Sequence, residues 1–264
     1  AGGAVLLPNS GALPAASYLP ILLDGELLGH VHVDVAARLT APLREAKAKD
    51  AEGKRPASVL GTLEIALITA DGAKRAPMLV LASAPARFLR PVLNVGLQRE
   101  EHIGSLEQTT LRIACAKNEL RRGEASHCEL APTNLFSLVA SLTPFCDFNQ
   151  SPRNMYQCQM GKQTMAVPFH SIPPRTDTNA YHLHTPQSPI VKTANYDKYG
   201  LNEYPLGTNA VVAVISYTGY DMEDAMIVNK GSYDRGFCHA SVRTVTNVDL
   251  SRMHKRGEAP HHRF

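Results

Sequence analysis

The chain has 264 residues, 44% of them hydrophobic, which is enough for one large or two modest domains with a buried core. Lys and Arg number 27 against 24 Asp and Glu, giving a formal charge of +3. This balance excludes a disordered polyelectrolyte and a protein held to nucleic acid by bulk charge alone. No apolar run reaches the roughly 18 residues of a membrane span, and the five cysteines form no C-x-x-C pair. We therefore expect reduced thiols, no zinc site and no membrane partner.

Strand-like and helix-like patterns alternate over the first half of the chain. Asp24-Gly25 between two apolar runs is typical of a hairpin turn. Leu39, Leu43 and Ala46 recur at helical spacing, and Pro132 suits the first turn of a helix. The expected elements are a hairpin over 18–35, a helix over 36–48, a loop over 50–56, strands over 63–69 and 78–82 around Asp71-Gly72, a strand over 87–95 and a short helix over 132–142.

The second half is richer in Asn, Gln, Pro and Met. A helix beginning at Pro152 is expected to end at Gly161, and residues 172–189 read as a Pro-rich connector. The apolar run within Asn209–Tyr217 predicts a strand buried on both faces, and Met222–Asn229 predicts a short helix. The expected fold class is mixed α+β and β-rich, with two sub-regions meeting near residue 140.

The helix predicted at Pro152 is unusually polar. Ser151 is a good N-cap residue, and a helix here places Arg153, Tyr156, Gln157 and Met160 on one face. Arg and Lys suit phosphate, Gln suits base edges or sugar hydroxyls, and Tyr offers a stacking plane. This composition favours a helix that addresses a polar partner. The alternative is a solvated, capped helix followed by a loop.

A second candidate is the acidic pair Glu223 and Asp224, expected at the start of a helix. Acidic residues at a helix N-terminus are stabilising through the dipole, which is the simpler interpretation. The functional interpretation is Mg²⁺, which typically uses one or two carboxylates together with substrate phosphates. The pair alone forms no cage, so other ligands must come from a nucleotide or another chain.

Other features carry less chemistry. His182 and His184 are interpreted as strand histidines, and Glu100-Glu101 as a solvated face. No P-loop, dinucleotide-binding or hydrolase-elbow motif occurs in the sequence. These standard enzyme classes are therefore excluded on motif grounds.

The two polar segments resemble a known family. RNMYQCQMGKQTM (153–165) and SYTGYDMEDAMIVNK (216–230) are similar to the second-largest subunit of multisubunit DNA-directed RNA polymerases, above all that of eukaryotic RNA polymerase I. The resemblance extends to RFLRPV (87–92), HCELAP (127–132) and the hairpin from Tyr18. It therefore covers nearly the whole chain.

The resemblance implies roles for single residues. Arg153 and Tyr156 match residues that face the incoming nucleotide, with Arg153 toward its phosphates. Lys162 and Gln163 match residues near the RNA end of the RNA–DNA hybrid. Family members usually carry Gly where this chain has Ala166, which puts the loop conformation there in question.

The resemblance also implies a metal. Glu223 and Asp224 match an acidic pair that faces the second, nucleotide-associated Mg²⁺, a site shared with the largest polymerase subunit. The catalytic residues implied are thus Arg153, Tyr156, Glu223 and Asp224. The chemistry is two-metal nucleotidyl transfer, to which this chain contributes positioning and charge stabilisation.

The resemblance implies that the chain works within a larger assembly that carries out rRNA-type transcription in the nucleolus of the nucleus. Its partners are the largest subunit and other polymerase subunits, the DNA template, the RNA–DNA hybrid and ribonucleoside triphosphates. The chain is expected to be a fragment: 1–140 belong to the external region, with a segment specific to the RNA polymerase I type over 18–75. Residues 141–264 open the hybrid-binding domain, with an incomplete double-psi β-barrel.

Two other functions stay open. The first is a non-catalytic nucleic-acid-binding or assembly remnant of the same subunit. The second is an unrelated Mg²⁺-dependent phosphotransferase, which would need its own carboxylate cluster. Beyond Glu223 and Asp224 the second half offers only scattered acidic residues, which disfavours the phosphotransferase.

Overall fold

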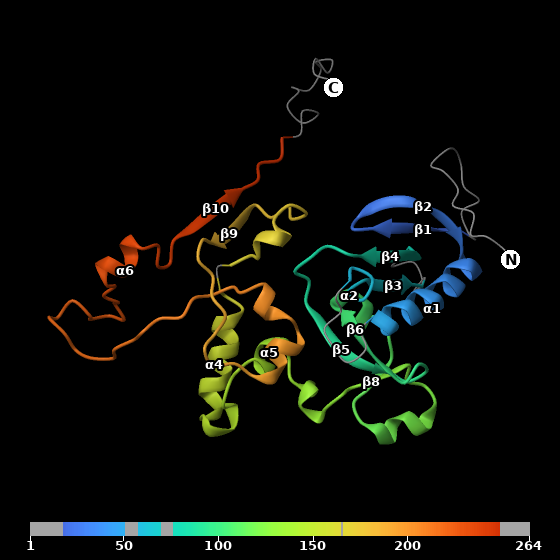
Figure 1. Cartoon of the computed structure of the whole chain (residues 1–264), viewed down its shortest axis with the longest axis horizontal. Coiled ribbons are helices and arrows are strands. Elements are labelled where there is room, and N and C mark those ends of the chain that lie inside the picture. The colour runs from blue at the N-terminus through green and yellow to red at the C-terminus, as the bar shows by residue number, and fades with distance from the viewer. Residues whose placement is uncertain (1–17, 51–57, 70–75, 165, 249–264) are drawn as a thin grey trace, which may run out of the picture. The chain divides into compact units, whose positions relative to one another are not determined.

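A computed structural model describes residues 18–50, 58–69, 76–164 and 166–248 (Figure 1). These residues form two units. The first runs to Thr164 and includes Ser188–Pro205, and the second contains residues 166–187 and 206–248. Of the loop predicted over 50–56, Asp50 is instead the last residue of helix α1 (Val33–Asp50), and 51–56 lie outside the described residues, as does the Asp71-Gly72 turn. The predicted boundary near residue 140 stays a prediction.

Ten strands and six α-helices are assigned in this part of the chain. The strands are β1 (Tyr18–Leu23), β2 (Glu26–His32), β3 (Glu64–Ile68), β4 (Met78–Ala82), β5 (Leu89–Asn94), β6 (Arg99–Gly104), β7 (Ile113–Ala114), β8 (His127–Cys128), β9 (Asn179–Leu183) and β10 (Ala240–Thr244). The α-helices are α1 (Val33–Asp50), α2 (Ser105–Gln108), α3 (Leu138–Ser141), α4 (Ser151–Gly161), α5 (Ala194–Lys198) and α6 (Lys230–Asp234). Short 3-10 helices are η1 (Lys117–Arg122), η2 (Pro132–Leu135), η3 (Cys146–Phe148), η4 (Phe169–Ser171) and η5 (Leu201–Glu203).

The predicted N-terminal hairpin is confirmed as β1 and β2. Asp24 and Gly25 both have positive φ, 50° and 91°, as a mirror-image hairpin turn requires. The Asp24 carboxylate accepts hydrogen bonds from the backbone amides of Ser83 and Ala84, 2.7 and 3.0 Å away. Burial favours a higher pKa for Asp24, yet a hydrogen bond from the Ser83 hydroxyl, together with the two backbone amides, holds the pKa below its ordinary value. The turn is thereby fixed to the end of β4.

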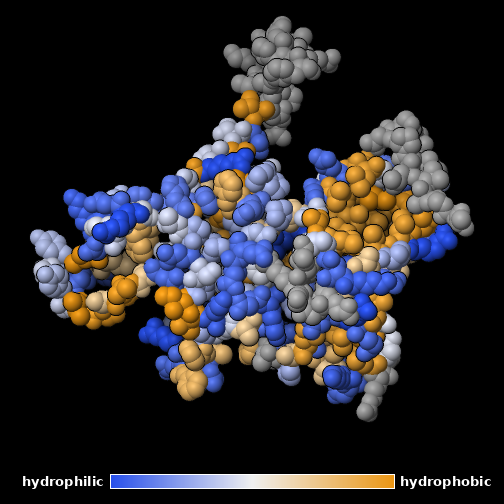
Figure 2. Space-filling view, viewed as in Figure 1, coloured by the Kyte–Doolittle hydropathy of each residue, from blue (hydrophilic) through white to orange (hydrophobic). Residues whose placement is uncertain are grey.

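The first sheet has the order β2-β1-β4-β3, with β1 parallel to β4 and the other pairs antiparallel. The core formed by this sheet and α1 consists of Leu19, Ile21, Val31, Ala36, Leu63, Ile65 and Leu79. Leu39 and Leu43 pack against it, as their helical spacing predicted. Hydrophobic residues also gather on the surface over β1 and β2 (Figure 2).

Helix α1 is longer than predicted at both ends. It begins at Val33, so the last three residues assigned to the hairpin are helical. Asp34 lies in its first turn and Lys47 and Lys49 in its last, which suits the helix dipole.

The second sheet, order β6-β5-β8-β7, contains the strand predicted over 87–95 as β5. The single helix predicted over 132–142 is wrong, because η2 and α3 divide the segment. The Ser137 hydroxyl caps α3 by accepting a hydrogen bond from the Ala140 amide at 3.3 Å. This local cap starts a separate helix there.

The second unit contains an antiparallel pair, β9 and β10. Strand β9 lies inside the segment predicted as a Pro-rich connector. Its partner β10 follows more than 50 residues later in the chain, so the local sequence did not indicate the pairing. His182 lies in β9 as expected, and His184 Nε2 is 2.6 Å from Ser241 Oγ. No helix in the described part of the chain is long and apolar enough to cross a membrane.

The strand predicted over Asn209–Tyr217 is wrong for this structure. No ladder forms there, and the side chains of Val211 and Val214 are 105% and 94% exposed. An apolar run makes a strand only when another strand offers hydrogen bonds, and none of the described segments does so here. The mixed α+β class with several sheets is confirmed.

Candidate functional site

The polar helix of the first unit forms over the predicted residues. Helix α4 begins at Ser151, with Pro152 in its first turn, and ends at Gly161. The predicted N-cap is wrong by one residue: Gln150 is the N-cap, with extended backbone and no side-chain cap. Ser151 is already helical, so its hydroxyl does not cap the helix.

Helix α4 buries none of its residues. Arg153 and Tyr156 are both exposed, and the guanidinium carbon of Arg153 lies 5.6 Å from the centre of the Tyr156 ring. A guanidinium above an aromatic face at this distance is a cation–π arrangement. The two side chains therefore form one exposed unit that combines a positive charge with a stacking surface.

Lys162 and Gln163 follow directly at the C-terminal end of α4. Both are exposed, and the Gln163 amide donates to the Met160 carbonyl at 2.9 Å. This turn holds the two residues beside the helix end. The first unit thus presents Arg153, Tyr156, Lys162 and Gln163 within one continuous exposed segment.

The acidic pair lies in the second unit and does not begin a helix. Glu223 and Asp224 have φ of 58° and 61°, and the Ala225 amide donates to the Met222 carbonyl at 3.2 Å. Two successive positive φ values closed in this way are the signature of a type I′ turn. The helix predicted over Met222–Asn229 is therefore wrong, since left-handed residues cannot continue a right-handed helix.

A neighbouring carboxylate shapes the loop. Asp221 Oδ2 accepts a hydrogen bond from the Tyr217 amide at 3.2 Å. This bond links the end of the apolar run to the acidic turn. The side chains of Glu223 and Asp224 are exposed, which leaves their oxygens accessible.

The donor set of this turn suits part of a magnesium site. Two exposed carboxylates supply hard oxygens, the ligand type that Mg²⁺ prefers. Within the described ranges no three His, Cys, Asp or Glu side chains gather in a metal-binding cluster. A metal here would need further ligands from outside these residues. Arg153 belongs to the first unit and the acidic pair to the second.

The first unit contains a buried ion cluster that the sequence did not predict. Arg44 Nη1 lies 2.6 Å from a carboxylate oxygen of both Glu101 and Glu107, and Lys47 Nζ lies 2.9 Å from Glu107. The side chains of Lys47, Glu101 and Glu107 are fully buried. The interpretation of Glu101 as part of a solvated face is therefore wrong, although Glu100 is exposed. Only the charges on α1, distant in sequence, could have signalled this burial.

Glu101 is the centre of this cluster. Burial alone would raise its pKa, but the hydrogen bond with His127, the charges of Lys47 and Arg44 and a hydrogen bond from Asn94 lower it to about 2. His127 Nε2 lies 3.1 Å from Glu101 Oε2, and Asn94 Nδ2 donates to the same oxygen at 2.8 Å. Every partner is internal, so the cluster holds the fold together and offers no open site.

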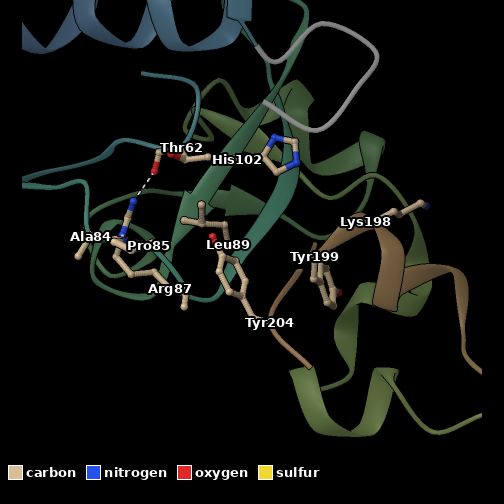
Figure 3. A pocket seen from close by; sticks show the side chains of 10 residues that line it. Thr62, Ala84, Pro85, Arg87, Leu89, His102, Lys198, Tyr199 and Tyr204 are labelled. Carbon is tan, nitrogen blue, oxygen red and sulfur yellow. Dashed lines mark hydrogen bonds between the residues drawn. The ribbon is translucent and has the colours of Figure 1, made fainter. Parts of the chain in front are cut away.

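A small cavity of about 50 Å³ also lies in the first unit (Figure 3). Arg87, His102, Tyr199 and Tyr204 are among its lining residues. Arg87 is engaged with protein atoms, because Nη2 donates to the Thr62 carbonyl at 2.7 Å and Nε to the Ala84 carbonyl at 2.6 Å. The space is far below the roughly 300 Å³ at which ligand pockets begin. It is not a nucleotide site.

Comparison with known proteins identifies the relatives of the chain. Residues 139–262 match the family model described as RNA polymerase Rpb2, domain 6. Over 246 residues the chain is 48% identical to DNA-directed RNA polymerase I subunit RPA2 of Mus musculus, covering 93% of this chain and 21% of the mouse protein.

Two further relatives agree. The human RNA polymerase I subunit RPA2 is 47% identical over 256 residues, which cover 96% of this chain and 22% of the human protein. RNA polymerase I subunit 2 of Arabidopsis thaliana is 42% identical over 263 residues, covering 96% and 22%. The chain spans about a fifth of the length of these curated relatives. It therefore belongs to the second-largest subunit family of multisubunit DNA-directed RNA polymerases, and its resemblance is to the RNA polymerase I members.

Proposed function

We propose that this chain contributes to template-directed ribonucleotidyl transfer inside a multisubunit polymerase of the RNA polymerase I type, in rRNA-type transcription in the nucleolus. One observation carries the proposal. Arg153 and Tyr156 form an exposed cation–π pair on a helix that buries no residue. A helix without a buried face gains little from its own chain, which favours a role toward an external partner.

The roles proposed for this segment follow from side-chain chemistry. Arg153 binds the triphosphate, since a planar guanidinium can donate two parallel hydrogen bonds to phosphate oxygens. Tyr156 orients the nucleotide with its ring. Lys162 and Gln163 contact the RNA–DNA hybrid, Lys162 as a point charge for phosphate and Gln163 through its amide. Together they hold the reacting groups in place, which accelerates transfer by lowering its entropic barrier.

Glu223 and Asp224 are the residues of this chain that would hold the second Mg²⁺, with the remaining ligands from the largest subunit. When bound, that ion supplies charge stabilisation for the triphosphate and the leaving pyrophosphate. The turn exposes the carboxylates of two successive residues to solvent, so ligands from another chain or a nucleotide can reach a metal ion bound there. The chain contributes carboxylate charge at this place.

The exposed apolar run within Asn209–Tyr217 also acquires a role in the assembly. The run forms no strand in this structure, and we assign it as a contact surface through which the hybrid-binding part of the chain joins a double-psi β-barrel completed within the assembly. Its exposed valines support the assignment, because their burial requires a partner that the described residues do not supply. The DNA template, the largest subunit and the other polymerase subunits are the proposed partners.

Arg153→Ala tests the proposal in the assembled polymerase carrying the full-length subunit. We expect the apparent KM for ribonucleoside triphosphates to rise by about 10- to 100-fold, the range of a lost charged hydrogen bond. Arg38→Ala on the exposed side of α1 is the matched control and should leave KM unchanged. An unchanged KM and rate for Arg153→Ala would contradict the proposal and favour the alternative, that α4 is a solvated helix without a binding role.

A second candidate is a non-catalytic assembly or nucleic-acid-binding role. The exposed apolar side chains at 211–215 favour it, because such a run marks an interaction surface. The same experiment separates the two functions. Under the second candidate, Arg153→Ala changes neither KM nor rate, whereas charged substitutions at Val211 and Val214 reduce incorporation of the subunit.

A further inference from the structure

Helix α4 is attached to the first unit along one narrow stripe. Asn154, Cys158 and Gly161 are its partly buried residues, and all the others are exposed. Their spacing of four and three residues places them on one face. Arg153 directly precedes Asn154, Tyr156 follows it by two residues, and both lie outside this stripe. The position of the exposed pair therefore depends on very few contacts.

Asn154 makes the directional contact of the stripe. Its Nδ2 donates to the Cys146 carbonyl at 2.7 Å, across eight residues of sequence. Cys146 begins η3, which is entered through Phe145 in left-handed backbone with φ of 53°. The hydrogen bond thus joins the first half of α4 to the turn that precedes it. The Oδ1 atom of the same amide is buried and accepts no hydrogen bond from the described residues.

Gly161 makes the close contact at the other end. A Cβ built on Gly161 would lie 2.8 Å from Cγ1 of Val139 in α3, closer than side chains pack. Helix α3 is held in turn, because the Thr193 hydroxyl donates to the Ser141 carbonyl at 3.0 Å. The C-terminal end of α4 therefore rests on α3, while its N-terminal half depends on the Asn154 hydrogen bond.

We infer that Asn154 is a positioning residue for nucleotide binding: its side-chain amide fixes α4 so that Arg153 and Tyr156 point to the triphosphate. The inference rests on the proposed function. Without the hydrogen bond the first turns of α4 have no buried apolar contact to restrain them. A shift of about 1 Å in a positioned group can lower catalysis as much as 100-fold. Asn154 itself needs no contact with substrate.

Asn154→Asp is the sharpest variant, because it keeps the shape of the side chain and replaces the donor with an acceptor that faces the Cys146 carbonyl. In the assembled polymerase we expect the apparent KM for ribonucleoside triphosphates to rise about three- to tenfold, the scale of one neutral hydrogen bond. Asn154→Gln retains an amide donor and should recover part of this loss. Asn118→Asp, on the exposed helix η1, is the matched control and should change nothing.

A double-mutant cycle with Arg153→Ala gives the decisive readout. If Asn154 acts through Arg153 and its partner Tyr156, Asn154→Asp raises KM by a smaller factor in the Arg153→Ala background than in the unmodified subunit. Independent, multiplying effects would overturn the inference, as would reduced incorporation of the subunit with normal kinetics of the remaining enzyme. If Asn154→Asp leaves KM unchanged while Arg153→Ala raises it, the inference fails and the proposed function stands. If Arg153→Ala itself has no effect, both fail together.

Discussion

The carboxylate of Glu64 occupies the space that a side chain at Gly104 would need. A Cβ built on Gly104 would overlap all three carboxylate atoms of Glu64. From this place Glu64 Oε1 accepts hydrogen bonds from the backbone amides of Leu106 and Glu107, at 2.7 and 2.9 Å. A residue of β3 thus satisfies the N-terminal amides of α2, which short helices cannot satisfy by themselves. The absence of a side chain at residue 104 makes this possible.

Gly104→Ala should therefore destabilise the chain by about 1–3 kcal/mol, because the new methyl displaces the Glu64 carboxylate. Chemical denaturation measures the loss. Gly96→Ala is the matched control, since a Cβ there would meet its nearest neighbour, Asn94 Oδ1, at an ordinary 3.6 Å. Equal unfolding free energies for the two variants would show that the carboxylate moves aside freely.

Lys47→Met removes one charge from the buried cluster and keeps the length of the side chain. Of the Lys and Arg side chains that contact Glu101 and Glu107, Arg44 then remains, and breaking a buried pair typically costs about 3–5 kcal/mol. Lys49→Met is the control, because its pair with Glu45 is exposed and screened by solvent, so its loss changes stability little. Thermal unfolding of both variants should separate them clearly, and a Lys47→Met variant as stable as Lys49→Met would contradict the burial.

The low pKa of Glu101 predicts a pH dependence of stability. A carboxylate with a pKa of about 2 in the fold and 4.5 ordinarily stabilises the fold above pH 4.5, and this contribution is lost as the pH falls from 4.5 through 2. At about 1.4 kcal/mol per pKa unit, the total is about 3 kcal/mol. Denaturant unfolding at a series of pH values checks it. Glu101→Gln should flatten the curve over this window, and a parallel curve would refute the assignment.

The exposed valines predict self-association of the isolated chain. Val211→Lys with Val214→Lys should leave the free energy of unfolding within about 0.5 kcal/mol, since both side chains already face solvent. The same change should reduce concentration-dependent association, measured by sedimentation velocity, because an exposed apolar run is a contact surface. A clear loss of stability would mean that these valines are buried.

Local signals in the sequence predicted the elements that local interactions determine. Asp24-Gly25 located the hairpin because two residues with positive φ suffice for its turn. Pro152 and Gly161 located α4 because they mark the start and the end of a helix without reference to the rest of the fold. The exposed Arg153 and Tyr156 followed from the same helical spacing.

The failures share a dependence on distant residues. The strand character of His182 was predicted, but its segment was assigned to a connector because the partner strand β10 lies far along the chain. Glu101 was assigned to a solvated face because Arg44 and Lys47 approach it from α1. The strand expected over Asn209–Tyr217 needs a partner that the described residues do not supply. The helix predicted at Glu223 was wrong because acidic residues suit the first turn of a helix, while here the same two residues have positive φ and form a turn. Composition does not distinguish the two.

The acidic turn offers the most direct test of the central claim, that this chain takes part in nucleotidyl transfer. Glu223→Gln with Asp224→Asn removes both charges while keeping side-chain size, and Asn tolerates left-handed backbone. In the assembled polymerase the measurement is the rate of single-nucleotide addition as a function of Mg²⁺ concentration. The proposal predicts a slower maximal rate and a higher Mg²⁺ concentration at half-maximal rate, with normal assembly. A rate and Mg²⁺ dependence equal to the unmodified enzyme would contradict it.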